Sequence, residues 1–300
     1  NSPVTPQPRA RWIPLLRCYD RFGRLKGTAA AIIFHHDGPW AGSSWAIFGL
    51  TNIDLFKRGD KTGSHLLLST VEHLLRGLYL TCPEPGFMCY RDGEAVEASA
   101  LVCNNGIRDA EAVLSCEVID ARRGETFLAR QEKSLLLRRG EQRKVSFRWP
   151  ARKFESDLYE VRFTLRHRGR AVDSISTGFV VYREEIMHGG PPFAWGNNAM
   201  TVGNRARLLC GTNQTGVMLG PWWENPLAWD RELSLMRDMG LRILRLLHIS
   251  HFAGDLERPD EKMLRRMDAI VQLCQRYGIA LFPCTHDWIG GISIDSDALR

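Results

Sequence analysis

The feature that most constrains this chain is an alternation of apolar runs and amphipathic stretches between Arg207 and Asp287. Three short apolar runs, at residues 208–216, 240–248 and 279–288, each end in polar or aromatic residues. The two stretches between them carry apolar side chains at helical spacing, and Gly240 and Gly278 stand where each helix should end. The pattern predicts strand, helix, strand, helix and strand, with both helices covering a parallel sheet.

The signals at the start of each helix fit this interpretation. Asn225 is a good N-cap and Pro226 a good first helical residue, and Asp260 opens the second helix. A step of roughly 35 residues between strands suits either a (β/α)₈ barrel or a doubly wound sheet. No glycine-rich phosphate loop follows the first strand, which disfavours nucleotide binding.

Upstream, in residues 91–183, the sequence pattern changes from alternating strands and helices to short strands alone. Short strand-like runs are separated by turn signals such as Asn104-Asn105-Gly106 and Arg168-Gly169. Six such runs in about 90 residues predict an immunoglobulin-like β-sandwich. The expected strands are residues 96–102, 113–119, 133–137, 144–149, 158–165 and 171–181.

The first 90 residues predict three strands, at 12–19, 27–35 and 43–50, and an amphipathic helix over 65–80. We interpret this part as the C-terminal remnant of an α/β domain. Residues 184–204 predict an irregular linker, and residues 205–300 the partial barrel or sheet. The fold class is therefore multidomain, with a partial α/β segment, a β-sandwich and three βα units.

Composition excludes some classes of function. The net charge of +6 comes mainly from arginine, and the alternating run at 161–166 predicts a solvated sheet face and no nucleic-acid groove. No apolar run is long enough to span a membrane. The eight cysteines form no zinc-like set, and a bridge between Cys82 and Cys89 stays open. We interpret His35, His36 and Asp37 as polar loop residues and not as a metal site, because neighbouring strand residues point to opposite faces.

The start of the chain leaves localisation open. Asn1 is not preceded by a methionine and no signal peptide is visible, so we expect the native N-terminus to be missing from this sequence. We therefore expect either an extracytoplasmic or a cytoplasmic protein.

Several motifs resemble the retaining (β/α)₈-barrel glycoside hydrolases, in particular β-galactosidase, β-glucuronidase and β-mannosidase relatives. The end of the sandwich is similar to theirs at Leu158-Tyr159, Asp173 and Thr177-Gly178-Phe179, and the start of the barrel at residues 200–213 and 238–245. Residues 45–56 also resemble the last strand of amidotransferase-like domains attached to some such enzymes. Two departures, Gln214-Thr215-Gly216 and residues 248–252, suggest a substrate other than a simple galactoside.

The resemblance implies a two-carboxylate retaining mechanism acting on a β-glycoside. It places the nucleophile and the acid/base at the ends of the fourth and seventh strands, beyond residue 300. We therefore expect neither catalytic glutamate in this chain. The resemblance implies no cofactor, no metal, no nucleic-acid partner and no membrane; the partner is a carbohydrate substrate, and homo-oligomerisation stays open.

The resemblance gives Arg245 the task of keeping the nucleophile carboxylate ionised, because a nearby cation lowers the pKa of a carboxyl group. The alternative is that Arg245 pairs with a structural acid. Asn213 is a candidate donor to a sugar hydroxyl, or else a turn-forming residue. The remaining substrate-binding candidates are His286, Asp287 and Trp288, where Asp287 could instead cap a helix, and then His248, Trp222 and Trp223.

Two hypotheses follow for the parent protein. The first is a multidomain glycoside hydrolase of which this sequence is a fragment. The second is a non-catalytic carbohydrate-binding or scaffolding protein with a degenerate barrel. An Asn-Glu pair at the end of a fourth strand, with a later strand-end Glu, would favour the enzyme.

Overall fold

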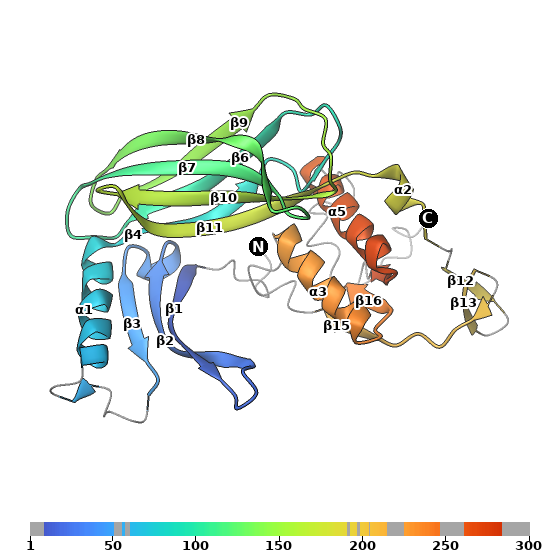
Figure 1. Ribbon diagram of the computed structural model, residues 1–300, viewed down its shortest axis with the longest axis horizontal. Helices are drawn as coiled ribbons and strands as arrows, with labels where there is room; N and C mark the ends of the chain where they lie inside the picture. Colours follow the sequence, from blue (N-terminus) through green and yellow to red (C-terminus); the bar gives the residue numbers. More distant parts are fainter. Residues whose placement is uncertain are drawn as a thin grey trace, which may run out of the picture. The chain divides into compact units, whose positions relative to one another are not determined.

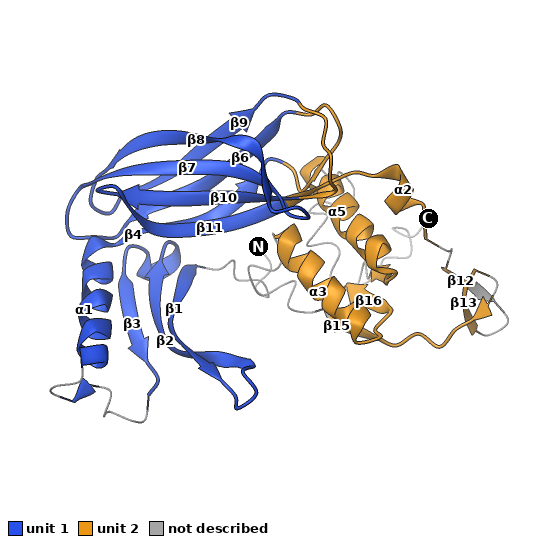
Figure 2. Ribbon diagram, in the orientation of Figure 1, with its two compact units in different colours: residues 1–86, 95–151, 159–178 blue, residues 87–94, 152–158, 179–300 orange. Residues whose placement is uncertain are grey.

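Residues 9–50, 56–57, 61–190, 193–196, 199–203, 205–214, 225–246 and 261–283 are described by a computed structural model (Figure 1). The chain divides into two units (Figure 2). Unit 1 holds residues 1–86, 95–151 and 159–178, and unit 2 holds 87–94, 152–158 and 179–300. Within the described ranges, no helix is long and apolar enough to cross a membrane.

Unit 1 begins with an antiparallel sheet in the order β1-β2-β3. Its strands are β1 (Ala10–Tyr19), β2 (Leu25–His35) and β3 (Ser44–Phe48), with a short 3-10 helix, η1 (Gly38–Trp40), before β3. The three predicted strands are thus confirmed. The assignment of this part to an α/β remnant stays a prediction.

One face of this sheet packs on the first strands of the sandwich. Ile32 and Phe34 share a buried core with Tyr79 and Cys103, and the Phe34 and Tyr79 rings stack with centroids 4.4 Å apart. Arg11 forms an ion pair with the buried Asp173. These residues come from both the predicted remnant and the sandwich, so the two parts share one core inside unit 1.

The helix predicted over residues 65–80 is wrong in its last turn. Helix α1 (Lys61–Arg76) ends before Gly77, and strand β4 (Leu78–Pro85) follows directly and pairs with β6. Gly77 has a φ of +59°, and its amide donates to the carbonyl of His73 at 3.0 Å. A left-handed glycine of this kind ends helices, and the apolar residues after it continue as a strand.

The six predicted sandwich strands are confirmed. They are β6 (Val96–Asn104), β7 (Ala110–Asp120), β8 (Glu125–Leu137), β9 (Gln142–Trp149), β10 (Leu158–His167) and β11 (Arg170–Val181). With β4 and β5 (Cys89–Tyr90) they form two sheets, in the orders β4-β6-β9 and β5-β11-β10-β7-β8.

The two faces of the sandwich sheets differ as the alternation requires. Phe147 of β9 and Phe163 of β10 are buried between the sheets, with ring centroids 6.2 Å apart. On the outer face, Arg162 pairs with Glu160 at 2.8 Å, and Arg166 lies 3.8 Å from Glu132. The alternation predicted for this strand, with one face toward solvent, is therefore confirmed.

Residues 184–204 are more ordered than predicted. They contain helix α2 (Glu184–Met187) and the strands β12 (Phe193–Gly196) and β13 (Ala199–Val202), which pair antiparallel. Strand β14 (Arg205–Ala206) continues the same small sheet. The prediction of an irregular linker is wrong here, because strands of four residues between Gly and Pro give too little alternation to be recognised.

The predicted alternation of strands and helices is confirmed in unit 2. Strands β15 (Gly211–Gln214), β16 (Ile243–Leu246) and β17 (Ala280–Pro283) are parallel and adjacent in that order, linked through helices α3 (Pro226–Asp238) and α5 (Glu261–Tyr277). The Asn225 side chain caps α3 by accepting from the amide of Leu227 at 3.1 Å.

The core of unit 2 joins these helices to short segments that flank the sandwich strands. Trp229 and Leu233 of α3 and Ile270 of α5 are buried together with Leu244, alongside Met88, Cys89, Leu158 and Val180. The fully buried Gln272 donates to the carbonyl of Val181 and accepts from the amide of Arg183, both at 2.7 Å. Helix α5 thereby completes the hydrogen bonding of the backbone that leaves β11.

Candidate functional site

Three polar or aromatic side chains lie at one level across the parallel sheet of unit 2. Asn213 of β15 is in register with Arg245 of β16, and Arg245 is in register with Phe282 of β17. Side chains in register on neighbouring strands point to the same face of a sheet. The row therefore presents an amide, a guanidinium and an aromatic ring together, near the carboxyl ends of the strands.

This face is opposite to the one on which Leu244 packs against the helices, although residues of α5 also line the cavity that adjoins the row. The residue before Arg245, Leu244, is fully buried against α3 and α5. Because alternate residues of a strand face opposite ways, Arg245 projects from the other side. Arg245 is half-buried and Asn213 exposed.

The level below the row is built from small and apolar residues. Gly211, Ile243 and Ala280 are in register there. A side chain at Gly211 would place its Cβ 2.2 Å from the carbonyl oxygen of Ile243, so glycine permits the close approach of the two strands. Small and apolar residues on closely spaced strands therefore lie next to the row, two residues earlier on each strand.

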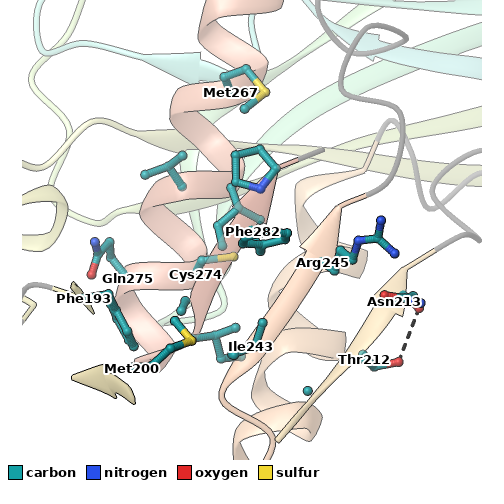
Figure 3. A pocket seen from close by; sticks show the side chains of 16 residues that line it. Phe193, Met200, Thr212, Asn213, Ile243, Arg245, Met267, Cys274, Gln275 and Phe282 are labelled. Atoms are coloured by element: carbon teal, nitrogen blue, oxygen red, sulfur yellow. Dashed lines mark hydrogen bonds between the residues drawn. The ribbon is translucent and has the colours of Figure 1, made fainter. Parts of the chain in front are cut away.

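A cavity of about 780 Å³ adjoins this row (Figure 3). Among its described lining residues, Arg245 is the one charged side chain. Figure 3 shows Phe282, Arg245 and Asn213 in the order of their strands. The other lining residues are mostly apolar: Phe193, Met200, Gly211, Thr212, Ile243, Met267, Val271, Cys274, Gln275, Ile279, Ala280, Leu281 and Pro283.

The thiol in this lining is not a nucleophile. Burial raises the pKa of Cys274 to about 12, so it is protonated at neutral pH and unreactive. In the described parts of the chain, no three histidine, cysteine or acidic side chains gather in a way that could hold a metal ion. The chemistry available here is a single cation with hydrogen-bond donors in an apolar cavity, which suits a hydroxyl-rich or anionic group.

Two of the predicted site residues, Arg245 and Asn213, are brought together on one face. The others, Trp222, Trp223, His248, His286, Asp287 and Trp288, lie outside the described residues. Phe282 was missed by the sequence analysis. Its signal was the two-residue alternation of Ala280 and Phe282, which is too short to stand out in a strand of four residues.

Comparison with known proteins gave matches among solved structures alone. No family profile and no curated protein sequence matches the chain. A family 2 glycosyl hydrolase from Bacteroides cellulosilyticus DSM 14838 is 16% identical, covering 68% of this chain and 26% of that one, with a TM-score of 0.36. Bacteroides uniformis β-glucuronidase is 19% identical over 70% of this chain and 23% of its own, with a TM-score of 0.35.

A putative β-galactosidase from Bacteroides fragilis is 12% identical over 70% of this chain and 28% of its own, with a TM-score of 0.32. The chain spans about a quarter of the length of these structures. These structural neighbours of the chain are glycoside hydrolases, at low identity and over part of their length.

Proposed function

We propose that this chain is part of a retaining β-glycoside hydrolase and supplies the substrate-holding side of its active site. The observation that carries this proposal is the row of Asn213, Arg245 and Phe282 on one face, at the carboxyl ends of parallel strands. These ends are where barrel enzymes place their chemistry. The sequence motifs before and within this row resemble those of the retaining hydrolases.

In the proposed mechanism, Arg245 acts on a carboxylate supplied from a later strand. A guanidinium within a few ångströms favours the ionised form and lowers the carboxyl pKa, so the group is a nucleophile at neutral pH. The carboxylate attacks the anomeric carbon while a second carboxylic acid protonates the departing glycosidic oxygen. Water then hydrolyses the glycosyl-enzyme, and the second group, now a carboxylate, takes the proton from that water.

The remaining members of the row hold the sugar. The Asn213 amide can donate to a ring hydroxyl, and its exposure leaves it accessible to a ligand. In this proposal the barrel is completed by strands beyond the three described, and both catalytic glutamates lie on them. The chain of 300 residues alone should therefore not hydrolyse glycosides.

The test is an assay of the protein from the full reading frame on chromogenic β-galactoside, β-glucoside, β-glucuronide and β-mannoside. Arg245→Met should lower kcat/KM by about 100-fold, as loss of an electrostatic partner of the reacting groups does. It should also move the acidic limb of the pH profile to higher pH, because the nucleophile loses its stabilising cation.

The matched control is Arg242→Met, which removes an exposed arginine three positions earlier, before the start of the same strand. It should leave both kcat/KM and the acidic limb unchanged. Equal losses in the two variants, or an unshifted limb in Arg245→Met, would contradict the role given to Arg245. A full-length protein that binds these sugars without turnover would instead support a carbohydrate-binding protein with a degenerate barrel.

A further inference from the structure

We propose that Phe282 is the stacking platform for the sugar ring in this site, and that the site therefore selects pyranosides with an open apolar face. This inference rests on the proposed function and adds a specificity-determining residue to it. Neither the sequence motifs nor the resemblance pointed to Phe282.

The exposure of Phe282 is the first observation. Phe282 is 57% exposed, whereas Leu244, on the opposite face of the same sheet, is fully buried. On β17, Phe282 shares its face with the small Ala280, so the ring stands clear of its neighbour along the strand. Phe282 also lines the cavity beside the row, so its exposed ring is accessible to a ligand there.

The position of the ring within the row is the second observation. Adjacent strands lie about 4.8 Å apart, so Phe282 and Asn213, two strands apart, are separated by about 10 Å. This is the separation of the two strand backbones, and a pyranose ring with its hydroxyl groups fits within it. A sugar lying on Phe282 could thus present a hydroxyl toward Asn213, with Arg245 between them.

The chemistry of the three groups matches the two sides of a sugar. The axial C–H groups of a pyranose make one face apolar, and an aromatic ring offers a flat apolar surface with a negative π-face. The equatorial hydroxyls need donors and acceptors, which Asn213 and Arg245 provide. A ring whose face carries an axial hydroxyl toward Phe282 would leave that hydroxyl without a partner, and such a sugar is disfavoured.

The experiment uses the full-length protein and the chromogenic β-glycoside that it hydrolyses best. Phe282→Ala should raise KM, and the Kd of the released monosaccharide measured by calorimetry, by about 3- to 10-fold, which corresponds to the loss of one stacking contact. kcat should change less than KM, because stacking acts on bound substrate and transition state alike. Phe282→Tyr should keep wild-type values, since the ring is retained.

Two further variants separate stacking from folding. Phe22→Ala removes a ring of similar exposure from unit 1 and should leave KM unchanged. Phe282→Leu keeps apolar bulk without the flat ring, and its KM should resemble that of Phe282→Ala. A wild-type KM in Phe282→Ala or in Phe282→Leu would overturn the inference while leaving the proposed function intact. A wild-type protein that neither binds nor hydrolyses any of the four glycosides would overturn both.

Discussion

At the scale of the residue, His73 of α1 is held in an environment that opposes its protonation. Its Nε2 atom is buried without a hydrogen-bond partner, and its ring centroid lies 5.6 Å from that of Phe34. Burial, together with the guanidinium charges of Arg76 and Arg11, lowers the pKa of His73 from 6.5 to about 4. The folded state thus binds fewer protons than the unfolded chain between these two pH values.

This shift predicts a pH-dependent stability. The contribution of neutral His73 is fully present above about pH 6.5 and is lost as the pH falls toward 4. Because the ring is only partly buried, we expect a loss of ~1–2 kcal/mol, measured by urea unfolding across this range. His73→Leu should flatten this part of the profile, and His65→Leu, at an exposed position of the same helix, is the control. An equally steep profile in His73→Leu would contradict the prediction.

The candidate site shows how far single residues can be predicted. Arg245 and Asn213 stood out because they end apolar runs in the two stretches, residues 200–213 and 238–245, that carry the resemblance. Their placement in register with each other and with Phe282 depends on strand pairing, which is a property of three segments separated by two helices. No local pattern in any one segment carries that information.

At the scale of the element, the boundary between α1 and β4 is set by Gly77. The apolar spacing of Leu74 and Leu78 suits a continued helix, and the sequence analysis followed it. The structure ends the helix because Gly77 adopts a φ of +59° and its backbone closely approaches Gly106. Tertiary contact with a turn that lies about 30 residues later therefore decides where the helix stops.

The close approach of Gly77 to this turn predicts that Gly77→Ala strongly lowers the free energy of unfolding. A Cβ at residue 77 would lie 2.1 Å from the amide nitrogen of Gly106, in addition to the strain of a positive φ. Gly124 also has a positive φ, of +76°, but nothing lies within 4 Å of its Cβ position. We expect Gly124→Ala to cost about 1 kcal/mol of unfolding free energy and Gly77→Ala about 3 kcal/mol or more. Equal costs in urea unfolding would show that the close approach is not needed.

At the scale of the whole molecule, the sandwich was predictable and the division into units was not. Strands of eight to thirteen residues repeat the alternation often enough to be recognised. The two units cut across sequence order, since residues 87–94 and 152–158 belong with the helices of unit 2. Such an assignment follows from long-range packing, which linear patterns and composition do not record.

Unit 2 is held together by ion pairs as well as by its apolar core. Arg265 of α5 is nearly buried and donates to Glu94 at 2.6 Å, and Arg276 donates to Asp157, also at 2.6 Å. Both acids come from the short segments that interrupt unit 1 in sequence. Buried charges of this kind are destabilising when one partner is removed. The segments 87–94 and 152–158 therefore depend on α5 for their partners.

This dependence predicts the effect of ending the chain after residue 183. The shortened chain would retain Met88, Cys89, Leu158 and Val180 but lose Trp229, Ile270 and the other helix residues that bury them. It would also leave Glu94 and Asp157 without their arginines. We expect it to bind a hydrophobic dye and to unfold at a lower urea concentration than the chain of 300 residues. Its free energy of unfolding should be lower by several kcal/mol, at ~1.5–3 kcal/mol for each uncovered side chain. A shortened chain that is equally stable and binds no dye would mean that the sandwich needs nothing from the helices that follow it.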